Sequence, residues 1–260
     1  MKICSIRSSS RGNAILVYTK DTVLLVDCGI SGKEAQNGIC QIGLSPENIS
    51  AILVTHEHHD HISGVGVMSR RYGLPVYANN LTWQAMEGKL GKINPDFKKT
   101  FNHIDNFEIG DIKIQPFSIS HDAADPVGYS FSNEKKKISI ATDTGILEEG
   151  LFRAIYGSET VLLESNHDKN MLDIGAYPLP LKQRIKSNKG HLSNDDAGKA
   201  AEFLVRMGTK YIILGHLSPE NNYPLLAKQT VMNSLIEAGI DPQKDVQLHI
   251  APSDCIGCIL

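Results

Sequence analysis

Residues 56–61 read His-Glu-His-His-Asp-His, the densest group of potential metal ligands in the chain. Neutral imidazole and carboxylate are ligands that Zn, Mn and Fe accept in proteins. In an extended turn His56 and His58 point the same way, whereas Asp60 and His61 lie one step further along and can serve a second ion. The spacing therefore predicts a site for two metal ions. The residues by themselves leave a solvated, histidine-rich surface loop as the alternative.

The segment also stands where a ligand site is expected in an α/β protein. Residues 51–55 are apolar or β-branched, which predicts a buried strand, and a helix can begin after residue 62. Residues 56–61 then follow the C-terminal end of a strand. Ligands collect at that edge of open α/β sheets because the crevice outside the strand ends is concave and lined by loops.

The pattern H-x-H-x-D-H in this segment resembles the signature of the metallo-β-lactamase superfamily. Members supply further ligands from three later strand ends, and this chain has a candidate after a short apolar run at each of them, in the same order. The resemblance implies two divalent ions, Zn, Mn or Fe, among which such ligands do not choose. It implies a first ion on His56, His58 and His121, a second on Asp60, His61 and His216, and Asp143 as the bridge.

Two later segments, residues 162–168 and 190–201, resemble the paired loops of tRNA-processing phosphodiesterases in this superfamily. The resemblance implies that hydroxide produced at the metals attacks phosphorus, that His191 protonates the leaving oxygen, and that Glu164 holds His191 in the correct tautomer. Asp60 is expected to be catalytic as well as metal-binding. The alternatives are a strand-end carboxylate for Glu164 and a residue at a helix entry for His191.

A finer resemblance, to the YycJ (WalJ) branch of bacterial 5′ to 3′ DNA exonucleases, covers nearly the whole chain. It rests on residues 120–129, 142–145, 164–168, 190–194 and 216–222. It implies a nucleic acid substrate, most simply DNA. Arg11 stands where that branch has a small residue, and a guanidinium there suits a phosphate. The expected substrate contacts are Ser10, Arg11, Asn13, Asn166, His167, Ser193 and Asn221.

Other functions use the same ligands. An RNA-processing nuclease fits the two loops as well as a DNA enzyme does, because no residue that reads a 2′-hydroxyl is identifiable. A thiolester or lactone hydrolase needs no leaving-group histidine, and a β-lactamase would be exported. A non-catalytic, metal-stabilised module would require a blocked ligand position.

Composition indicates how many domains the protein has, where it is located and which partners it binds. The 260 residues, 41% of them apolar, predict a single domain over residues 1–260. No apolar segment predicts a signal peptide or membrane span, and five cysteines suit reduced thiols, so we expect a cytoplasmic protein without membrane contact. Nothing predicts a protein partner. Cys255 and Cys258 are expected to be incidental. The net charge of -3 does not indicate a nucleic-acid binder, although basic residues at 182–189 either contact nucleic acid or are solvated.

The elements that position these residues follow from apolar periodicity. Strands are predicted at 2–7, 14–18, 23–27, 51–55, 76–78, 112–117, 128–131, 138–141, 161–163, 211–214 and 246–250. Helices are predicted at 32–42, 65–72, 82–89, 148–156, 181–187, 195–207 and 225–238. The pattern fits an α/β protein. The resemblance narrows it to an αββα sandwich, with two mixed β-sheets flanked by helices.

Overall fold

Two mixed β-sheets form the centre of the protein in its computed structural model, which describes residues 1–102 and 105–260. The first has the order β1-β2-β3-β4-β5-β6. These strands are Lys2–Ser9, Gly12–Tyr18, Val23–Val26, Ala51–Leu53, Val76–Asn79 and Lys98–Phe101. The second has the order β13-β12-β11-β10-β9-β8-β7. From β7 to β13 its strands are Phe107–Ile109, Ile112–Ser118, Val127–Ser132, Lys137–Ala141, Thr160–Glu164, Tyr211–Gly215 and Gln247–Ile250.

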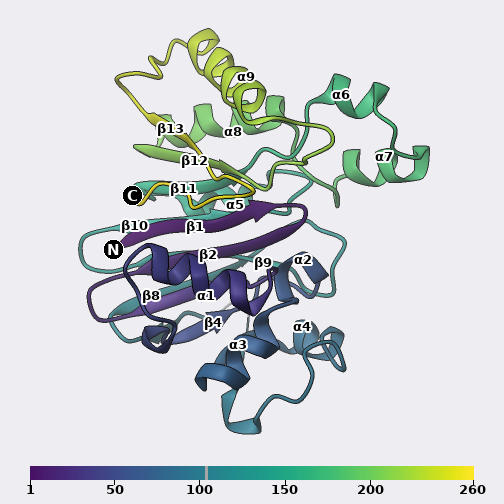
Figure 1. Cartoon of the computed structure of the whole chain (residues 1–260). Helices are drawn as coiled ribbons and strands as arrows, with labels where there is room; N and C mark the ends of the chain where they lie inside the picture. The colour runs from purple at the N-terminus through teal and green to yellow at the C-terminus, as the bar shows by residue number, and fades with distance from the viewer. Residues whose placement is uncertain (103–104) are drawn as a thin grey trace.

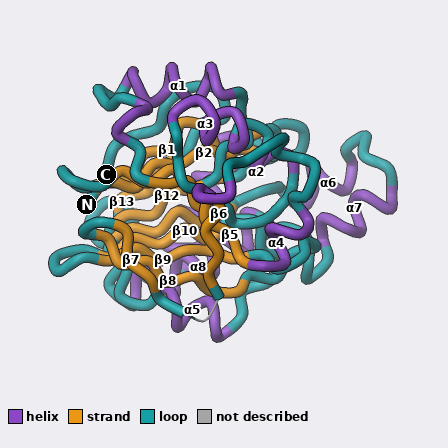
Figure 2. Tube along the Cα trace, turned by 90° about the horizontal axis from the view of Figure 1, so that it is seen from below, coloured by secondary structure: helices purple, strands orange, loops and turns teal. Residues whose placement is uncertain are grey.

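Helices cover the outer face of each sheet. From α1 to α9 they are Gly32–Gln41, His59–Ile62, Val65–Tyr72, Asn80–Ala85, Glu149–Ile155, Lys169–Ile174, Leu179–Lys186, Asn194–Arg206 and Pro224–Glu237. Figure 2 shows α1 and α3 on one side of the strands and α5 and α8 on the other, and in Figure 1 α1 lies in front of the strands of the first sheet. In both views α6 and α7 project to one side. The predicted αββα sandwich is confirmed.

Strand β2 shows why the layers stack in this way. Ala14 and Leu16 face the core beneath α1 and α3, whereas Ile15 and Val17 face the core between the two sheets, and all four are buried. A strand buried on both faces reads as a continuous apolar run. A slip of one residue would exchange the two sets of side chains, so the register is strongly specified and the loops at the strand ends are held in place.

Some elements differ from the sequence prediction. The short strands β6 and β7 were not predicted, because they lie at sheet edges and β6 begins with Lys98 and Lys99, charged residues that protect an edge but hide its strand pattern. Helix α6 was also not predicted. The helix predicted over 82–89 lies over Asn80–Ala85, and Gly88 beyond it has a φ of 74°, a left-handed conformation that ends a helix.

The chain ends lie side by side. Ile3 N donates to Leu260 O at 2.9 Å and Leu260 N donates to Ile3 O at 3.1 Å, so the last residues run alongside β1. Cys4 Sγ lies 3.5 Å from Gly257 O in the same arrangement. No helix within residues 1–102 and 105–260 is long and apolar enough to cross a membrane.

Candidate metal centre

The predicted metal ligands come from four strand ends in the two sheets. His56 and His58 follow β4, and the later three follow β8, β10 and β12. Asp143 and His216 have φ angles of 58° and 55°, and Asp27 after β3 has 57°. For non-glycine residues this left-handed backbone costs on the order of 1–3 kcal/mol, and such strain is typical of functional sites. Three strained residues therefore meet at one edge of the sandwich.

The histidine-rich segment was predicted to be an extended turn, but only its first part is extended, and its second part is helical. His58 is extended with φ −67° and ψ 149°, but α2 begins at His59, so Asp60 and His61 lie on a helical turn. The α2 amides of His61 and Ile62 both donate to His58 O, at 3.0 and 3.2 Å. The turn brings Asp60 beside His216, while the ring of His61 stays next to that of His56, with the ring centroids 4.1 Å apart.

Three histidines form the first group. His56 Nε2 lies 3.1 Å from His58 Nδ1, and His121 Nε2 lies 3.3 Å from the same atom. His121 Nδ1 lies 3.2 Å from Gly190 O, which as a carbonyl accepts the ring proton and leaves Nε2 free to bind a cation. One ligand atom from each of the three histidines lies within 4.8 Å of the other two, which is close enough to share one ion.

Asp60, His61 and His216 form the second group. Asp60 Oδ2 lies 3.4 Å from His61 Nε2 and 3.5 Å from His216 Nε2. Asp143 contacts both groups: its Oδ2 is 3.3 Å from His61 Nε2, and its Oδ1 is 3.3 Å from His216 Nε2 and 3.9 Å from His121 Nε2. The structure therefore brings all seven predicted ligands together, with Asp143 between the two groups.

The donor set fits divalent cations. No described residue donates a well-aligned hydrogen bond to Asp143 Oδ2, a buried atom, although His61 Nε2 lies 3.3 Å away. Burial alone would raise the pKa of Asp143, but His216 and His61 hold it well below its usual range. Burial likewise opposes protonation of His216, yet Asp143 raises its pKa to about 10. Cations would replace these protons, so metal binding should release them.

Asp27 was missed by the sequence analysis. It is 1% exposed, and its Oδ2 lies 2.8 Å from both His61 Nδ1 and Thr55 Oγ1, while its Oδ1 accepts from Thr55 N at 2.8 Å. A carboxylate on the far nitrogen of a histidine fixes the ring and directs Nε2 to the metal. A signal was present, since Asp27 directly follows the apolar run Val23–Val26. Asp27 is a positioning residue for His61.

Replacement of Asp27 by Asn is expected to weaken the affinity for divalent metal by about 10- to 100-fold. The variant keeps the size of the side chain but loses the charge that faces His61 Nδ1. Titration of the metal-free protein with Zn or Mn measures the change. Asp21→Asn, at an exposed position in the turn before β3, is the matched control. Equal affinity of the Asp27 variant and the unmodified protein would exclude this role.

Glu164 joins the metal centre to His191. Its Oε1 lies 2.8 Å from both His191 Nδ1 and His216 Nδ1, and its Oε2 accepts from Thr144 N at 2.8 Å and Leu192 N at 3.3 Å. Burial would raise the pKa of Glu164, but His191 and His216 lower it to about 2, so the group is ionised. The predicted pairing with His191 is present, and the shared bond to His216 was not anticipated.

The predicted substrate residues are divided between the centre and its surroundings. Asn13 Nδ2 lies 3.1 Å from His61 Nε2, and Asn166 Nδ2 donates to His216 O at 2.9 Å and to Ser10 Oγ at 3.3 Å. These residues therefore border the centre, and their substrate contacts stay predictions.

The other four predicted substrate residues have partners within the protein or lie apart. Ser193 caps α8, and Asn221 is buried with its side chain 3.5 Å from Ser218 Oγ. Arg11 is exposed and pairs with Glu220. His167 is buried, with no described partner for its Nδ1, and desolvation lowers its pKa to about 4. None of these four is placed within the two ligand groups.

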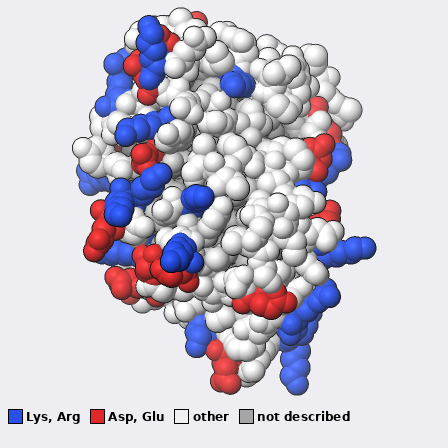
Figure 3. Space-filling model, turned by 60° about the vertical axis from the view of Figure 1, so that its left-hand side comes forward, with Lys and Arg blue, Asp and Glu red and all other residues white. Residues whose placement is uncertain are grey.

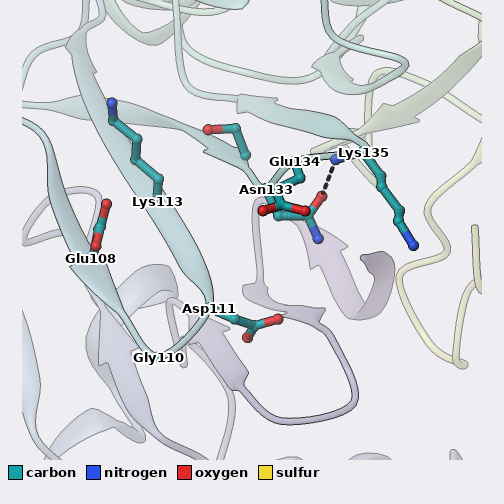
Figure 4. Close-up of a pocket in the computed structure, with 8 residues that line it drawn as sticks. Glu108, Gly110, Asp111, Lys113, Asn133, Glu134 and Lys135 are labelled. Atoms are coloured by element: carbon teal, nitrogen blue, oxygen red, sulfur yellow. Dashed lines mark hydrogen bonds between the residues drawn. The ribbon is translucent and has the colours of Figure 1, made fainter.

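At the opposite end of the second sheet, the described residues form no comparable group of potential metal ligands. A hollow of about 630 Å³ lies between the β7–β8 and β9–β10 turns, with Gly110 and Asp111 on one side and Asn133 and Glu134 on the other (Figure 4). These turns join the strand ends that point away from the predicted ligands. On the face in Figure 3, side chains of both charges are interspersed around an uncharged middle, so this view shows no continuous basic strip for nucleic acid.

Comparison with known proteins gives matches over most of the chain. Residues 22–217 match a family model described as a beta-lactamase superfamily domain. The chain is 43% identical to exodeoxyribonuclease YycJ of Bacillus anthracis over 242 residues, 93% of this chain and 92% of that protein. It is 41% identical to exodeoxyribonuclease WalJ of Streptococcus pneumoniae over 255 residues, 97% and 95% of the two chains.

Solved structures agree on the fold. The metallo-beta-lactamase fold protein YhfI from Bacillus subtilis superimposes with a TM-score of 0.74, over 100% of this chain and 98% of that one, at 17% identity. At that identity the likeness concerns the arrangement of strands and helices alone.

Proposed function

The chain belongs to the beta-lactamase superfamily, in the branch of the YycJ and WalJ exodeoxyribonucleases, and from this premise we propose that it is a two-metal nuclease that degrades DNA from 5′ to 3′. It is a metal-dependent hydrolase with a nucleic acid substrate. We propose that two ions are bound, that the nucleic acid is DNA and that cleavage proceeds from 5′ to 3′. The ligand sets proposed for the two ions are those that the sequence predicted.

One structural observation supports a nuclease independently of the comparisons with known proteins: His191 is held beside the ligand groups by a buried, ionised carboxylate. His191 Nδ1 lies 2.8 Å from Glu164 Oε1 and 3.8 Å from Asp143 Oδ1. A carboxylate at Nδ1 selects the tautomer and stabilises the protonated ring, so Nε2 can donate a proton. Cleavage of a phosphodiester releases an alkoxide, which needs that proton. Cleavage of a thiolester releases a thiolate, which leaves without one. This favours a nuclease over a thiolester hydrolase.

Each residue around the proposed ions then has a separate role in hydrolysis. Bound divalent ions supply a nucleophilic hydroxide near neutral pH and positive charge for the phosphoryl oxygens. Asp143 and the ligand histidines keep the ions at one place, while Asp27 and Glu164 fix the rings of His61 and His216. His191, held by Glu164 through Nδ1, donates its proton to the departing 3′ oxygen and is then reprotonated by water.

The proposal is tested with the purified protein on labelled single-stranded DNA, RNA and a simple phosphodiester. We expect hydrolysis of DNA after addition of Mn or Zn, its loss in excess chelator, and mononucleotides released from the 5′ end. Stronger activity on RNA would replace DNA as the substrate. A metal-loaded protein that hydrolyses a thiolester or lactone but no phosphodiester would reject the nuclease.

A further inference from the structure

A polar hollow of about 310 Å³ lies beside the metal centre and is not used by the mechanism above. Its walls come from the β1–β2 turn, the entry of α1 and the helical turn α2. The side chains that matter are Arg7, Arg11, Ser31, Glu34, His59 and Ser63. The volume lies within the range of small-ligand sites, and guanidinium and hydroxyl groups are typical phosphate donors.

The hollow shares a wall with the metal centre. His59 lines it and directly precedes Asp60. Gly29 lines it too, and its backbone is so close to α2 that an added Cβ would lie 1.5 Å from Asp60 O. A nucleic-acid strand that extends past Asp60 on the side of Gly29 and His59 would therefore enter the hollow.

The charges in the hollow favour an anion. Arg7 Nη1 donates to Ile6 O at 2.8 Å, and no ion pair to Arg7 is found within the described residues. The lining holds two guanidinium groups, Arg7 and Arg11, against one carboxylate, Glu34. Glu34 accepts from Ser31 N at 3.1 Å and from Ser31 Oγ at 2.7 Å, and these bonds and, to a smaller extent, Arg7 lower its pKa. Arg11 is paired with Glu220 at 2.7 Å, but this pair is exposed, and exposed pairs are weak and exchange partners easily.

The basic residues of α7 are a poorer candidate for the same role. Arg184 pairs with Asp122, and Lys186 pairs with Asp173. Lys182 Nζ donates to Asp173 O at 2.8 Å. Arg184 and Lys186 are therefore held in ion pairs, whereas no ion pair to Arg7 occurs within the described residues.

We propose that this hollow binds a phosphodiester of the DNA strand on the 3′ side of the scissile bond; the inference rests on the proposed function. His191 protonates the leaving 3′ oxygen, so the nucleotide on the 5′ side lies next to His191. His191 borders Asp143 and His216, whereas the hollow is lined by Gly29 and by His59, which precedes Asp60. The strand on the other side of the bond therefore runs toward Arg7 and Arg11.

Arg7→Gln tests the assignment with 5′-phosphorylated oligothymidylates that are extended stepwise at the 3′ end. In the unmodified enzyme KM should fall as nucleotides are added, and in the variant most of this gain should be lost. For a single-stranded ligand, one lost phosphate contact makes the slope of log Kd against log salt shallower by roughly 0.7, or about fivefold weaker binding at ~0.1 M salt. Lys2→Gln, with the same change of charge at the far end of β1, is the control.

The outcomes separate the two proposals. If Arg7→Gln keeps the full gain from 3′ extension and the parental salt slope, the hollow is not a phosphate site, and the nuclease proposal stands. If the unmodified protein hydrolyses no nucleic acid with Mn or Zn, the nuclease proposal fails whatever the variant binds. Arg11→Gln, at an exposed position, gives a second measurement in case Arg7→Gln does not fold, and it should weaken DNA binding in the same direction.

Discussion

Asp143→Asn is expected to lose bound divalent metal and DNA cleavage together, with activity falling by roughly 10³-fold or more. Asp143 approaches both ligand groups: its oxygens lie 3.3 Å from His61 Nε2 and His216 Nε2 in the second group, and its Oδ1 lies 3.9 Å from His121 Nε2 in the first. An amide of the same shape keeps the backbone, since Asn tolerates the left-handed φ of 58°. It removes the charge that holds two cations together. Metal ions supply several kcal/mol of transition-state stabilisation, which corresponds to the stated loss.

Metal content by elemental analysis and the rate on labelled DNA, each before and after added Mn, measure both effects. Asp111→Asn is the control, because Asp111 is an exposed aspartate that accepts from Thr19 Oγ1 at 2.7 Å at the opposite end of the sheet. An Asp143→Asn protein that retains two ions and the parental rate would remove Asp143 from the bridging position and undermine the ligand scheme.

His191→Ala is expected to retain both metals but to cleave DNA about 10² to 10⁴ times more slowly, the usual contribution of a general acid. His191 is close to Asp143 and His216 but is in neither proposed ligand group, because its Nδ1 lies 2.8 Å from Glu164 Oε1. Removing it leaves the departing 3′ oxygen without a proton donor. The rate at saturating substrate, together with metal analysis of the same sample, checks both parts of the prediction.

The leaving group distinguishes this role from a structural one. Thymidine 5′-(4-nitrophenyl phosphate) releases nitrophenolate, a weak base that departs without protonation. His191→Ala should therefore lose much less activity on this ester than on DNA. Glu164→Gln should show the same selectivity with a smaller loss, and also weaker metal binding because Glu164 contacts His216. Equal losses on both substrates would mean that His191 does not act as the acid.

The sequence was most informative where chemistry and secondary structure coincide locally. His56, His58, Asp60 and His61 lie within one short segment, so their proximity needed no tertiary information. The later candidates came from the resemblance to the metallo-β-lactamase superfamily, and each follows an apolar run that predicts a strand. Parallel neighbours in a sheet bring their carboxyl ends to one edge, as β10, β11 and β12 do here.

Polar contacts between distant segments were much harder to predict. Asp27 follows a strand as the predicted ligands do, yet its partner His61 is 34 residues away and nothing in the spacing joins them. The ion pair between Arg11 and Glu220 spans 209 residues, and it changes Arg11 from a free phosphate donor into a paired one. Such contacts depend on which loops the two sheets bring together.

The amino-acid sequence alone indicated the metal-binding chemistry of residues 56–61 and the buried strands, because side-chain chemistry and apolar periodicity are local properties. Its resemblance to a known superfamily supplied the later candidate ligands and their order. Only the tertiary structure decided that one oxygen of Glu164 lies 2.8 Å from both His191 and His216, that Asp27 holds His61, and that Arg7 and Arg11 share a hollow beside Asp60. Each of these depends on the stacking of two sheets whose contacting residues are far apart in the chain. Packing of the apolar faces sets that arrangement, and the polar contacts form where the packed strands end.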